Sequence, residues 1–325
     1  MATAEQLKAL VKSHAEGDDS RFYSIALQVA AGAARGGKNR FAQEMRDLVD
    51  SLRKSIGKSS TRPVPVAQPR GELVGLLTAN YPSIRMCDIV LEPDVRQQLD
   101  RALLEQRQQD RLTAKGFHPL RKLLLIGPPG TGKTMSASAL AGELQLPLFT
   151  IRLDGLITKF MGETAAKLRL VFDALIQTRG VYLFDEVDAL GGERARSNDV
   201  GEIRRVLNSF LQFLENDVSE SLLVAATNHP QLLDRAMFRR FDSVIEYPLP
   251  TGAVACEVIR NRLAGVVLGK IAWSKVKEVA SGLSHSEITL AAERAAKDTI
   301  LSGKSSISTA NLVNALKDRH TGSPP

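Results

Sequence analysis

Eight consecutive residues have the types and spacing needed to bind the phosphates of a nucleotide: Gly127, Pro128, Pro129, Gly130, Thr131, Gly132, Lys133 and Thr134. An apolar run at 121–126 precedes them, and a segment of helical composition beginning with Met135, which we include in the nucleotide site, follows. A strand, a glycine-rich turn and a helix N-terminus in this order form a P-loop, whose backbone N–H groups point at the β-phosphate. Lys133 would reach the β- and γ-phosphate oxygens, and Thr134 would offer its hydroxyl to Mg²⁺. The pattern predicts a site for a nucleoside triphosphate.

Two carboxylates stand at the end of a second apolar segment, 181–185, where Asp185 is the last residue and Glu186 comes next. Asp185 could hold the Mg²⁺ shell, and Glu186 could orient and polarise the water that attacks the γ-phosphate. An acidic pair at a strand end can also be merely solvated, but its position downstream of a P-loop favours the catalytic interpretation. Loss of Glu186 is then expected to permit nucleotide binding and to stop hydrolysis.

A third apolar segment, 221–226, leads to Thr227 and Asn228. The carboxyl ends of parallel strands lie along one edge of a sheet, and ligands bind at that edge. Asn228 would therefore lie near the γ-phosphate and the attacking water. Alone, an asparagine before His-Pro indicates a turn. Together with the other two motifs, it predicts a residue that senses the γ-phosphate.

The composition of the chain excludes several classes of protein. Its 325 residues are 43% apolar, enough for about two domains with a sizeable core. The two cysteines, Cys87 and Cys256, form no CxxC motif, which argues against a disulfide framework and favours the reducing cytoplasm. No apolar run approaches the roughly 18 residues of a membrane span, and the first residues lack the pattern of a signal peptide. A net charge of +7 permits contact with nucleic acid without requiring it.

The elements that must position these motifs fall into four parts of the sequence. Residues 1–56 show three short helical patterns and would form an all-α region that recruits a client or partner. Residues 57–80 contain a basic, proline-bearing stretch, expected to be a flexible linker rather than a nucleic-acid contact. Residues 81–249 alternate strands with helices, which predicts an α/β domain whose parallel sheet is sandwiched by helices. Residues 250–325 show helical patterns only and predict a small helical lid.

The expected elements can be given by range. The strands are 121–126, 148–153, 181–185, 221–226 and 243–247. The helices of the α/β domain are 92–115, 133–144, 163–178, 201–215 and 230–237. The helices of the lid are 253–268, 273–280, 285–302 and 308–318.

The complete set of motifs resembles the AAA family of ATPases, within the AAA+ superfamily. The set comprises the P-loop, the Asp185-Glu186 pair, the Ala-Thr-Asn segment that ends at Asn228, and the run LDRAMFRRFD at 233–242. The resemblance extends over about residues 80–320 and points to the protein-remodelling branch with a single ATPase module. It implies a P-loop NTPase fold with a helical lid, Mg²⁺-dependent hydrolysis of ATP to ADP and phosphate, and a homo-oligomeric ring, usually a hexamer, with nucleotide held between subunits.

The resemblance also gives Arg239 and Arg240 a role. In the family, two arginines after this helix reach into the neighbouring subunit's site and are usually separated by a short insert such as Pro-Gly. Here they are adjacent, so the sequence leaves open which of them is the trans arginine finger. A finger of this kind contributes roughly 10³–10⁵-fold to the rate, because it neutralises charge on the γ-phosphate in the transition state.

Lys159, Phe160, Met161 and Gly162 lie between the second expected strand and its helix. In the family, an aromatic-apolar-glycine triplet at this place lines the central pore and grips an extended polypeptide. A flat ring and a flexible methionine suit sequence-tolerant contact, and glycine permits a sharp turn. Lys159 would help to hold the substrate. The alternative is that Phe160 only anchors its loop in the core.

Other positions match the family less closely. Asp88 and Ile89 resemble a segment whose backbone contacts adenine. Arg262 stands where the family has a ribose-contacting histidine, and His285 begins a His-Ser-Glu sequence where the family has Gly-Ala-Asp. His285 could face the adenine or the neighbour's phosphates, or it could cap its helix together with Ser284.

The leading hypothesis is an ATP-driven unfoldase, a chaperone-like remodeller that threads a protein client through a central pore. The chain has no protease motif, so a peptidase, if one takes part, would be a separate protein. The alternative is a nucleic-acid machine such as a clamp loader or initiator, for which Arg294 is the nearest sensor arginine. The Phe160-Met161-Gly162 triplet and the lack of a recognisable DNA-binding module favour polypeptide and make nucleic acid a poor candidate partner.

Overall fold

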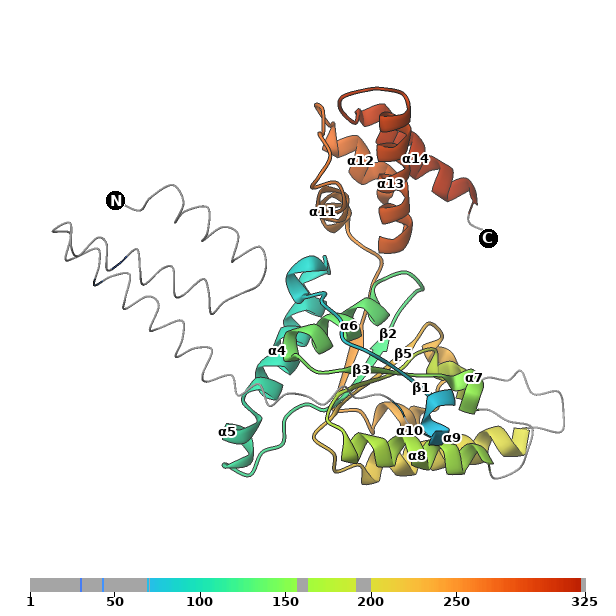
Figure 1. Ribbon diagram of the computed structural model, residues 1–325. Coiled ribbons are helices and arrows are strands. Elements are labelled where there is room, and N and C mark those ends of the chain that lie inside the picture. The colour runs from blue at the N-terminus through green and yellow to red at the C-terminus, as the bar shows by residue number, and fades with distance from the viewer. Residues whose placement is uncertain are drawn as a thin grey trace. The chain divides into compact units, whose positions relative to one another are not determined.

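The computed structural model describes residues 71–156, 163–190 and 200–322, together with Ala30, Gln43 and Pro69, and all structural statements concern these residues (Figure 1). The chain divides into two units, Met1–Pro65 and Val66–Pro325. The second unit contains all the elements that position the site. The proposed pore-loop residues 159–162 and nearly all of the N-terminal helical region lie outside the described residues, so the predictions made for them stay predictions.

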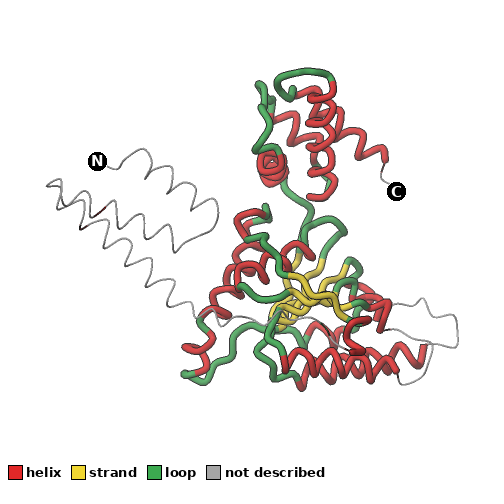
Figure 2. Tube along the Cα trace, in the orientation of Figure 1, coloured by secondary structure: helices red, strands yellow, loops and turns green. Residues whose placement is uncertain are grey.

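Six strands form one sheet in the order β1-β3-β4-β5-β2-β6, seen in yellow in Figure 2. They are β1 (Leu77–Asn80), β2 (Lys122–Ile126), β3 (Leu148–Ile151), β4 (Val181–Phe184), β5 (Leu222–Thr227) and β6 (Ser243–Glu246). Strands β2 to β6 pair in parallel, which confirms the five expected strands with small shifts at their ends. Since β2 lies beside β5, and β5 beside β4, the three motifs that follow these strands meet at one edge.

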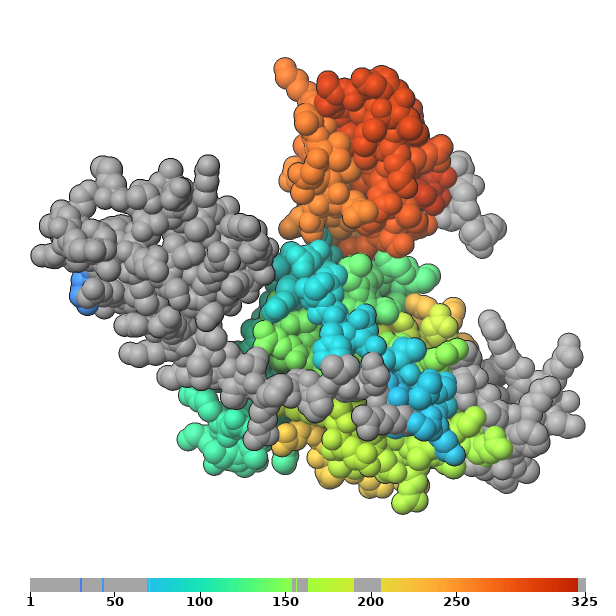
Figure 3. Space-filling model, viewed as in Figure 1, coloured from blue at the N-terminus to red at the C-terminus, as the bar shows by residue number. Residues whose placement is uncertain are grey.

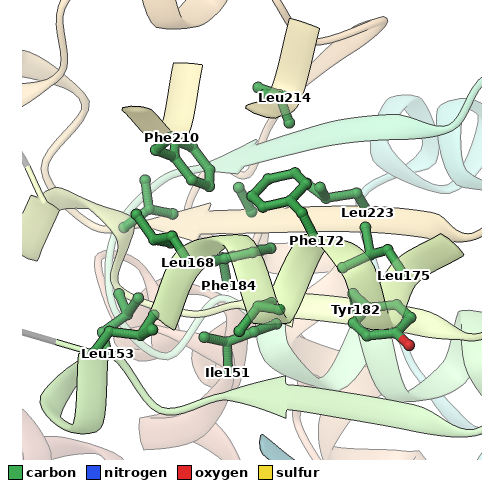
Figure 4. Packing of buried hydrophobic residues seen from close by; sticks show 14 of the residues in the cluster. Ile151, Leu153, Leu168, Phe172, Leu175, Tyr182, Phe184, Phe210, Leu214 and Leu223 are labelled. Atoms are coloured by element: carbon green, nitrogen blue, oxygen red, sulfur yellow. The ribbon is translucent and has the colours of Figure 1, made fainter. Parts of the chain in front are cut away.

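Helices cover both faces of the sheet because side chains alternate between the faces along each strand. Tyr182 and Phe184 of β4 pack with α8 (Glu163–Gln177) and α9 (Val200–Asn216). Val181 and Leu183 pack with α4 (Pro93–Arg107) and α6 (Lys133–Leu144) on the opposite face. Figure 4 shows the first layer, where Phe210 of α9 meets Phe184 edge-on at 5.2 Å between ring centroids. Sheet and helices therefore form a rigid three-layer base for the loops at the sheet edge.

Strand β1 was not expected. It pairs antiparallel with β3, with Leu77 opposite Ile151, and a 3₁₀ helix, η1 (Gly71–Gly75), precedes it. The assignment of 57–80 to a flexible linker is thus wrong for 71–80, and the sheet is parallel except at this edge. The four residues Leu-Thr-Ala-Asn are too short and too polar to signal a strand. The exposed edge of β3 supplies the hydrogen-bonding partner, and burial of Leu76 and Leu77 in the core stabilises the pairing.

Two expected helices of the α/β domain are divided. The range 92–115 forms α4 and the short α5 (Gln109–Thr113); α5 buries no side chain, so no packing keeps it in line with α4. The range 230–237 forms a 3₁₀ turn, η4 (Pro230–Leu232), and α10 (Arg235–Phe238). The break occurs because Asp234 is extended and caps α10, its carboxylate accepting a hydrogen bond from the N–H of Ala236 at 2.8 Å.

The C-terminal helices α11 (Gly252–Arg262), α12 (Trp273–Ala280), α13 (His285–Leu301) and α14 (Thr309–Gly322) pack around a core of their own, which we call the lid (orange to red in Figures 1 and 3). Helix α11 ends six residues before the expected 268, where Leu268 instead forms a β-bridge with Ile307. The fold is the expected P-loop α/β sheet followed by helices. None of the helices in the described ranges is long and apolar enough to cross a membrane.

Candidate active site

The P-loop backbone has the shape of a phosphate cradle. Gly127, Gly130 and Gly132 all have positive φ angles. A Cβ atom on Gly127 would overlap the carbonyl oxygen of Tyr247, and one on Gly130 would lie 2.8 Å from the Ser284 hydroxyl oxygen. These two positions therefore require glycine on grounds of both conformation and space. The loop leads directly into the N-terminus of α6, which favours anions through its free N–H groups and its dipole.

Lys133 is buried within this loop. Its ammonium donates hydrogen bonds to the carbonyl oxygens of Gly127 and Pro128, both at 2.8 Å. Burial lowers the pKa of Lys133, while the nearby carboxylates of Asp185 and Asp188 act in the opposite direction. The direct hydrogen-bond partners of the ammonium are neutral carbonyls, and phosphate oxygens would offer it stronger, anionic acceptors.

Thr134 and Asp185 come together as the motifs predict. The Thr134 hydroxyl donates to a carboxylate oxygen of Asp185 at 2.7 Å, which joins the P-loop to the end of β4. Within the described residues, no group of three or more His, Cys, Asp or Glu could hold a metal by itself. Mg²⁺ is typically bound by one or two protein oxygens, with substrate phosphates and water as the other ligands, so this hydroxyl–carboxylate pair fits it. When bound, Mg²⁺ would neutralise charge on the β- and γ-phosphates.

Glu186 has a left-handed backbone, with φ of 53°, which is rare for a residue other than glycine, asparagine or aspartate. Two hydrogen bonds hold this conformation: its N–H donates to Asp185 Oδ1 at 3.0 Å, and its carbonyl accepts from the N–H of Ala189 at 2.9 Å. Strain of this kind concentrates at functional sites. Glu186 is part of the cavity wall together with Asp185 and Asn228.

Asn228 directly follows β5, and the residue before it is firmly held. The Thr227 hydroxyl donates to Asp188 at 2.7 Å and accepts from the N–H of His229 at 3.0 Å. The analysis of the sequence did not single out Asp188, which lies in the 3₁₀ turn η3 (Val187–Leu190). The sequence signal that could have identified Asp188 is its position two residues after the Asp185-Glu186 pair.

The motifs surround one cavity of about 840 Å³, large enough for a nucleotide. It brings together most of the predicted site residues, namely Asp88, Ile89, Pro129, Gly130, Thr131, Gly132, Lys133, Thr134, Met135, Asp185, Glu186, Asn228 and His285. Gly127 and Pro128 stand behind this wall and bind Lys133. Arg239 and Arg240 are not part of the wall.

The lid contributes more of the wall than the sequence analysis predicted. Helix α13 supplies Ser286, Thr289, Leu290 and Glu293, and α11 supplies Val258, Asn261 and Arg262. The α13 residues recur at helical spacing, a signal that could have identified one face of that helix. Arg262 pairs with Glu293 at 2.7 Å across the two helices.

The structure decides between two interpretations of His285. The helix cap is Ser284, whose hydroxyl accepts from the N–H of Glu287. Both ring nitrogens of His285 are buried and have no hydrogen-bond partner among the described residues. Burial lowers the pKa of His285, with Glu92 acting in the opposite direction. The imidazole is therefore not the cap, and it stays a candidate for contact with nucleotide.

The two arginines after α10 differ sharply. Arg240 binds Glu215 at 3.3 Å and donates to the carbonyl oxygen of Ala236 at 2.8 Å. Arg239 is exposed, and its guanidinium forms no hydrogen bond or ion pair within the part of the chain that the structure describes. Of the two, Arg239 is the more exposed and needs to break no ion pair or hydrogen bond among the described residues to meet a partner.

Comparisons with known proteins agree with this geometry. The family described as "ATPase family associated with various cellular activities (AAA)" matches residues 123–249. The chain is 31% identical over 323 residues to the uncharacterized AAA family ATPase y4kL of Sinorhizobium fredii, covering 98% of this chain and 96% of that protein. It is 30% identical to the proteasome-activating nucleotidase of Methanothermobacter thermautotrophicus, over 70% of this chain and 57% of that protein.

A solved structure supports the fold. The crystal structure of the FIGL-1 AAA domain superposes with a TM-score of 0.60 over 75% of this chain and 85% of that chain, at 24% identity. The near full-length relationship to y4kL and the motif geometry lead to the same conclusion. The chain belongs to the AAA family of ATPases, with the motifs of its protein-remodelling branch, and it hydrolyses ATP.

Proposed function

We propose that this ATPase works as a ring, usually a hexamer in its family, and uses ATP hydrolysis to pull on a polypeptide client. The observation that carries the ring arrangement is the contrast between a complete set of nucleotide-binding motifs at the cavity and an exposed arginine, Arg239, outside the cavity wall. Lys133 is the one cationic side chain that the sheet side of the cavity supplies among the described residues, while the exposed Arg239 lies outside the wall. A neighbouring subunit's Arg239 would complete the site.

The chemistry follows from the residues around the cavity. Glu186 would orient a water molecule and take up its proton as the water oxygen bonds to the γ-phosphorus and the bond to the β–γ bridging oxygen breaks. Lys133 and the trans Arg239 would stabilise the charge on the phosphoryl oxygens, and Asn228 would hold the water and the γ-phosphate. Asp88, Ile89 and His285 would contact the remainder of the nucleotide.

Polypeptide as the client is supported by the sequence around Phe160 and by one relative. Phe160-Met161-Gly162 suits contact with varied sequences. The name of the proteasome-activating nucleotidase, of which this chain spans 57%, suggests a separate peptidase as partner. The nucleic-acid alternative needs a sensor arginine in the lid. Arg294 is paired with Asp318 at 3.1 Å and is absent from the cavity wall, which counts against that alternative.

The test compares ATP turnover with and without an unfolded protein and with and without DNA. We expect stimulation by unfolded protein and its loss in Phe160→Ala. The matched control is Phe117→Ala, since Phe117 is 64% exposed and is not part of the nucleotide cavity wall. Stimulation by DNA that persists in Phe160→Ala would reject the proposal in favour of a nucleic-acid machine. Glu186→Gln, which should trap ATP, is the variant with which to co-purify the client and any peptidase.

A further inference from the structure

Two residues without an assigned role, Asp188 and Thr227, join the ends of β4 and β5. Backbone pairing between these strands ends at Phe184 and Ala225. Beyond that pair, Glu186 and Asn228 each continue on a separate piece of chain. The Thr227–Asp188 hydrogen bond, at 2.7 Å, is a side-chain link between these pieces.

Thr227 makes hydrogen bonds to three segments around the site. It is 1% exposed, and its carbonyl oxygen accepts from the N–H of Gly127, the first residue of the P-loop, at 3.3 Å. Its hydroxyl donates to Asp188 on one side and accepts from the N–H of His229 on the other. One buried residue thus touches the P-loop, the turn after Glu186 and the segment that carries Asn228.

Asp188 lies in the turn that begins at Glu186. That turn is closed by the hydrogen bond from the Ala189 N–H to the Glu186 carbonyl, at 2.9 Å, and Glu186 itself has a left-handed backbone. A conformation of this kind persists only when the surrounding structure holds it. A hydrogen bond from a buried hydroxyl to a carboxylate is among the stronger ones available for that purpose.

We propose that Asp188 and Thr227 are positioning residues for ATP hydrolysis: their hydrogen bond holds Glu186 and Asn228 at a fixed separation across the γ-phosphate position. The proposal rests on the hydrolytic roles given above to Glu186 and Asn228. Neither Asp188 nor Thr227 is part of the cavity wall, so both act through their neighbours, which for the Asp188 carboxylate include Lys133. Their loss should reduce the rate of hydrolysis and leave nucleotide binding nearly unchanged.

The experiment uses the full chain and four variants. Asp188→Ala removes the acceptor, Thr227→Val removes the hydroxyl at similar volume, Thr227→Ser keeps the hydroxyl, and the double variant combines Asp188→Ala with Thr227→Val. We expect kcat to fall roughly 10- to 100-fold in Asp188→Ala and Thr227→Val, as for a small displacement of catalytic groups. Thr227→Ser should remain within about threefold of the parent. The dissociation constant of a fluorescent ATP analogue should change less than about threefold throughout.

The double variant identifies the shared bond. If both residues act through one hydrogen bond, the kcat of the double variant should be no lower than that of the more impaired single variant. Losses that multiply, losses that occur in nucleotide affinity instead of kcat, or a Thr227→Ser as impaired as Thr227→Val would each overturn the proposal. Thermal melts establish that every variant is folded.

A parallel measurement on Glu186→Gln distinguishes a failure of the positioning proposal from a failure of the catalytic role proposed for Glu186. Full hydrolysis by Glu186→Gln would reject the role of Glu186. Loss of hydrolysis in Glu186→Gln together with normal kcat in Asp188→Ala and Thr227→Val would reject only the positioning role.

Discussion

The sheet side and the lid side of the nucleotide cavity are held in different ways. On the sheet side, hydrogen bonds fix Lys133, Thr134 and Asp185 and the backbone of Glu186. On the lid side, Arg262 is paired with Glu293 and Asn261 donates to the Asp88 carbonyl, but the His285 ring nitrogens have no partner among the described residues. The lid meets the P-loop through one backbone hydrogen bond, from the Ser286 N–H to the Gly130 carbonyl at 3.0 Å. Groups that stabilise a transition state must be fixed in advance, whereas groups that only bind need not be. Changes on the sheet side should therefore alter kcat, and changes on the lid side should alter affinity or stability.

The largest effect is expected at Arg239, which belongs to neither side of the cavity in its own subunit. Arg239→Ala should lower kcat roughly 10³-fold, because the neighbour's site loses its finger. Arg240→Ala should cost less, since Arg240 is already bound to Glu215. Mixing Arg239→Ala with Glu186→Gln should restore part of the ATPase activity, since some mixed interfaces then combine an intact Glu186 with an intact Arg239. If mixing restores nothing, the arginine does not act in trans.

Glu186→Gln tests the sheet side directly. Removing the general base should lower kcat about 10²- to 10⁴-fold and leave ATP affinity intact, as measured by single-turnover hydrolysis and equilibrium binding. Glu246→Gln, an exposed carboxylate on β6, is the control. A comparable loss of ATP affinity in Glu186→Gln would contradict the division between the two sides.

Gly130→Ala tests the contact between the P-loop on the sheet side and Ser284 on the lid side. Alanine would have to adopt φ of 74° and place its Cβ 2.8 Å from the Ser284 hydroxyl oxygen. We expect nucleotide affinity to fall about tenfold, because a penalty of about 1–2 kcal/mol for the left-handed backbone adds to the displacement of the lid. Gly116→Ala is a matched control, with φ of 81° and open space around the Cβ position. Equal nucleotide affinity in the two variants would show that the Ser284 contact is unimportant.

The smallest effect concerns His285 and pH. Burial lowers its folded-state pKa below the unfolded value of about 6.5, so the neutral form is favoured in the folded protein. Its contribution to stability is present above about pH 6.5 and is lost as the pH falls below that value, because the unfolded state then binds more protons. The melting temperature of nucleotide-free protein should therefore fall less between pH 7.5 and 5.5 in His285→Gln than in the parent. His118→Gln, at an exposed position, should keep the parental slope. If the melting temperature of His285→Gln falls with pH as steeply as that of the parent, His285 is not held in its neutral form by burial.

Much of the fold could be predicted because its signals are local. Apolar runs bounded by Gly, Pro or acidic residues marked the five parallel strands, and α6 and α12 were predicted at both ends. Strand β1 and the break between α4 and α5 escaped prediction because both depend on contacts with other parts of the chain. The edge of β3 recruits β1, and no packing surface holds α5 in line with α4.

The sequence by itself determined the phosphate end of the site, since the P-loop, Asp185, Glu186 and Asn228 carry their chemistry in residue type and in position after a strand. Only the tertiary structure decided the rest. It placed Asp188 against Thr227, left Arg239 free while binding Arg240, and brought α11 and α13 to the cavity. These outcomes depend on which side chains meet across segments distant in the chain. Contacts of that kind are fixed by packing and have no counterpart in local spacing.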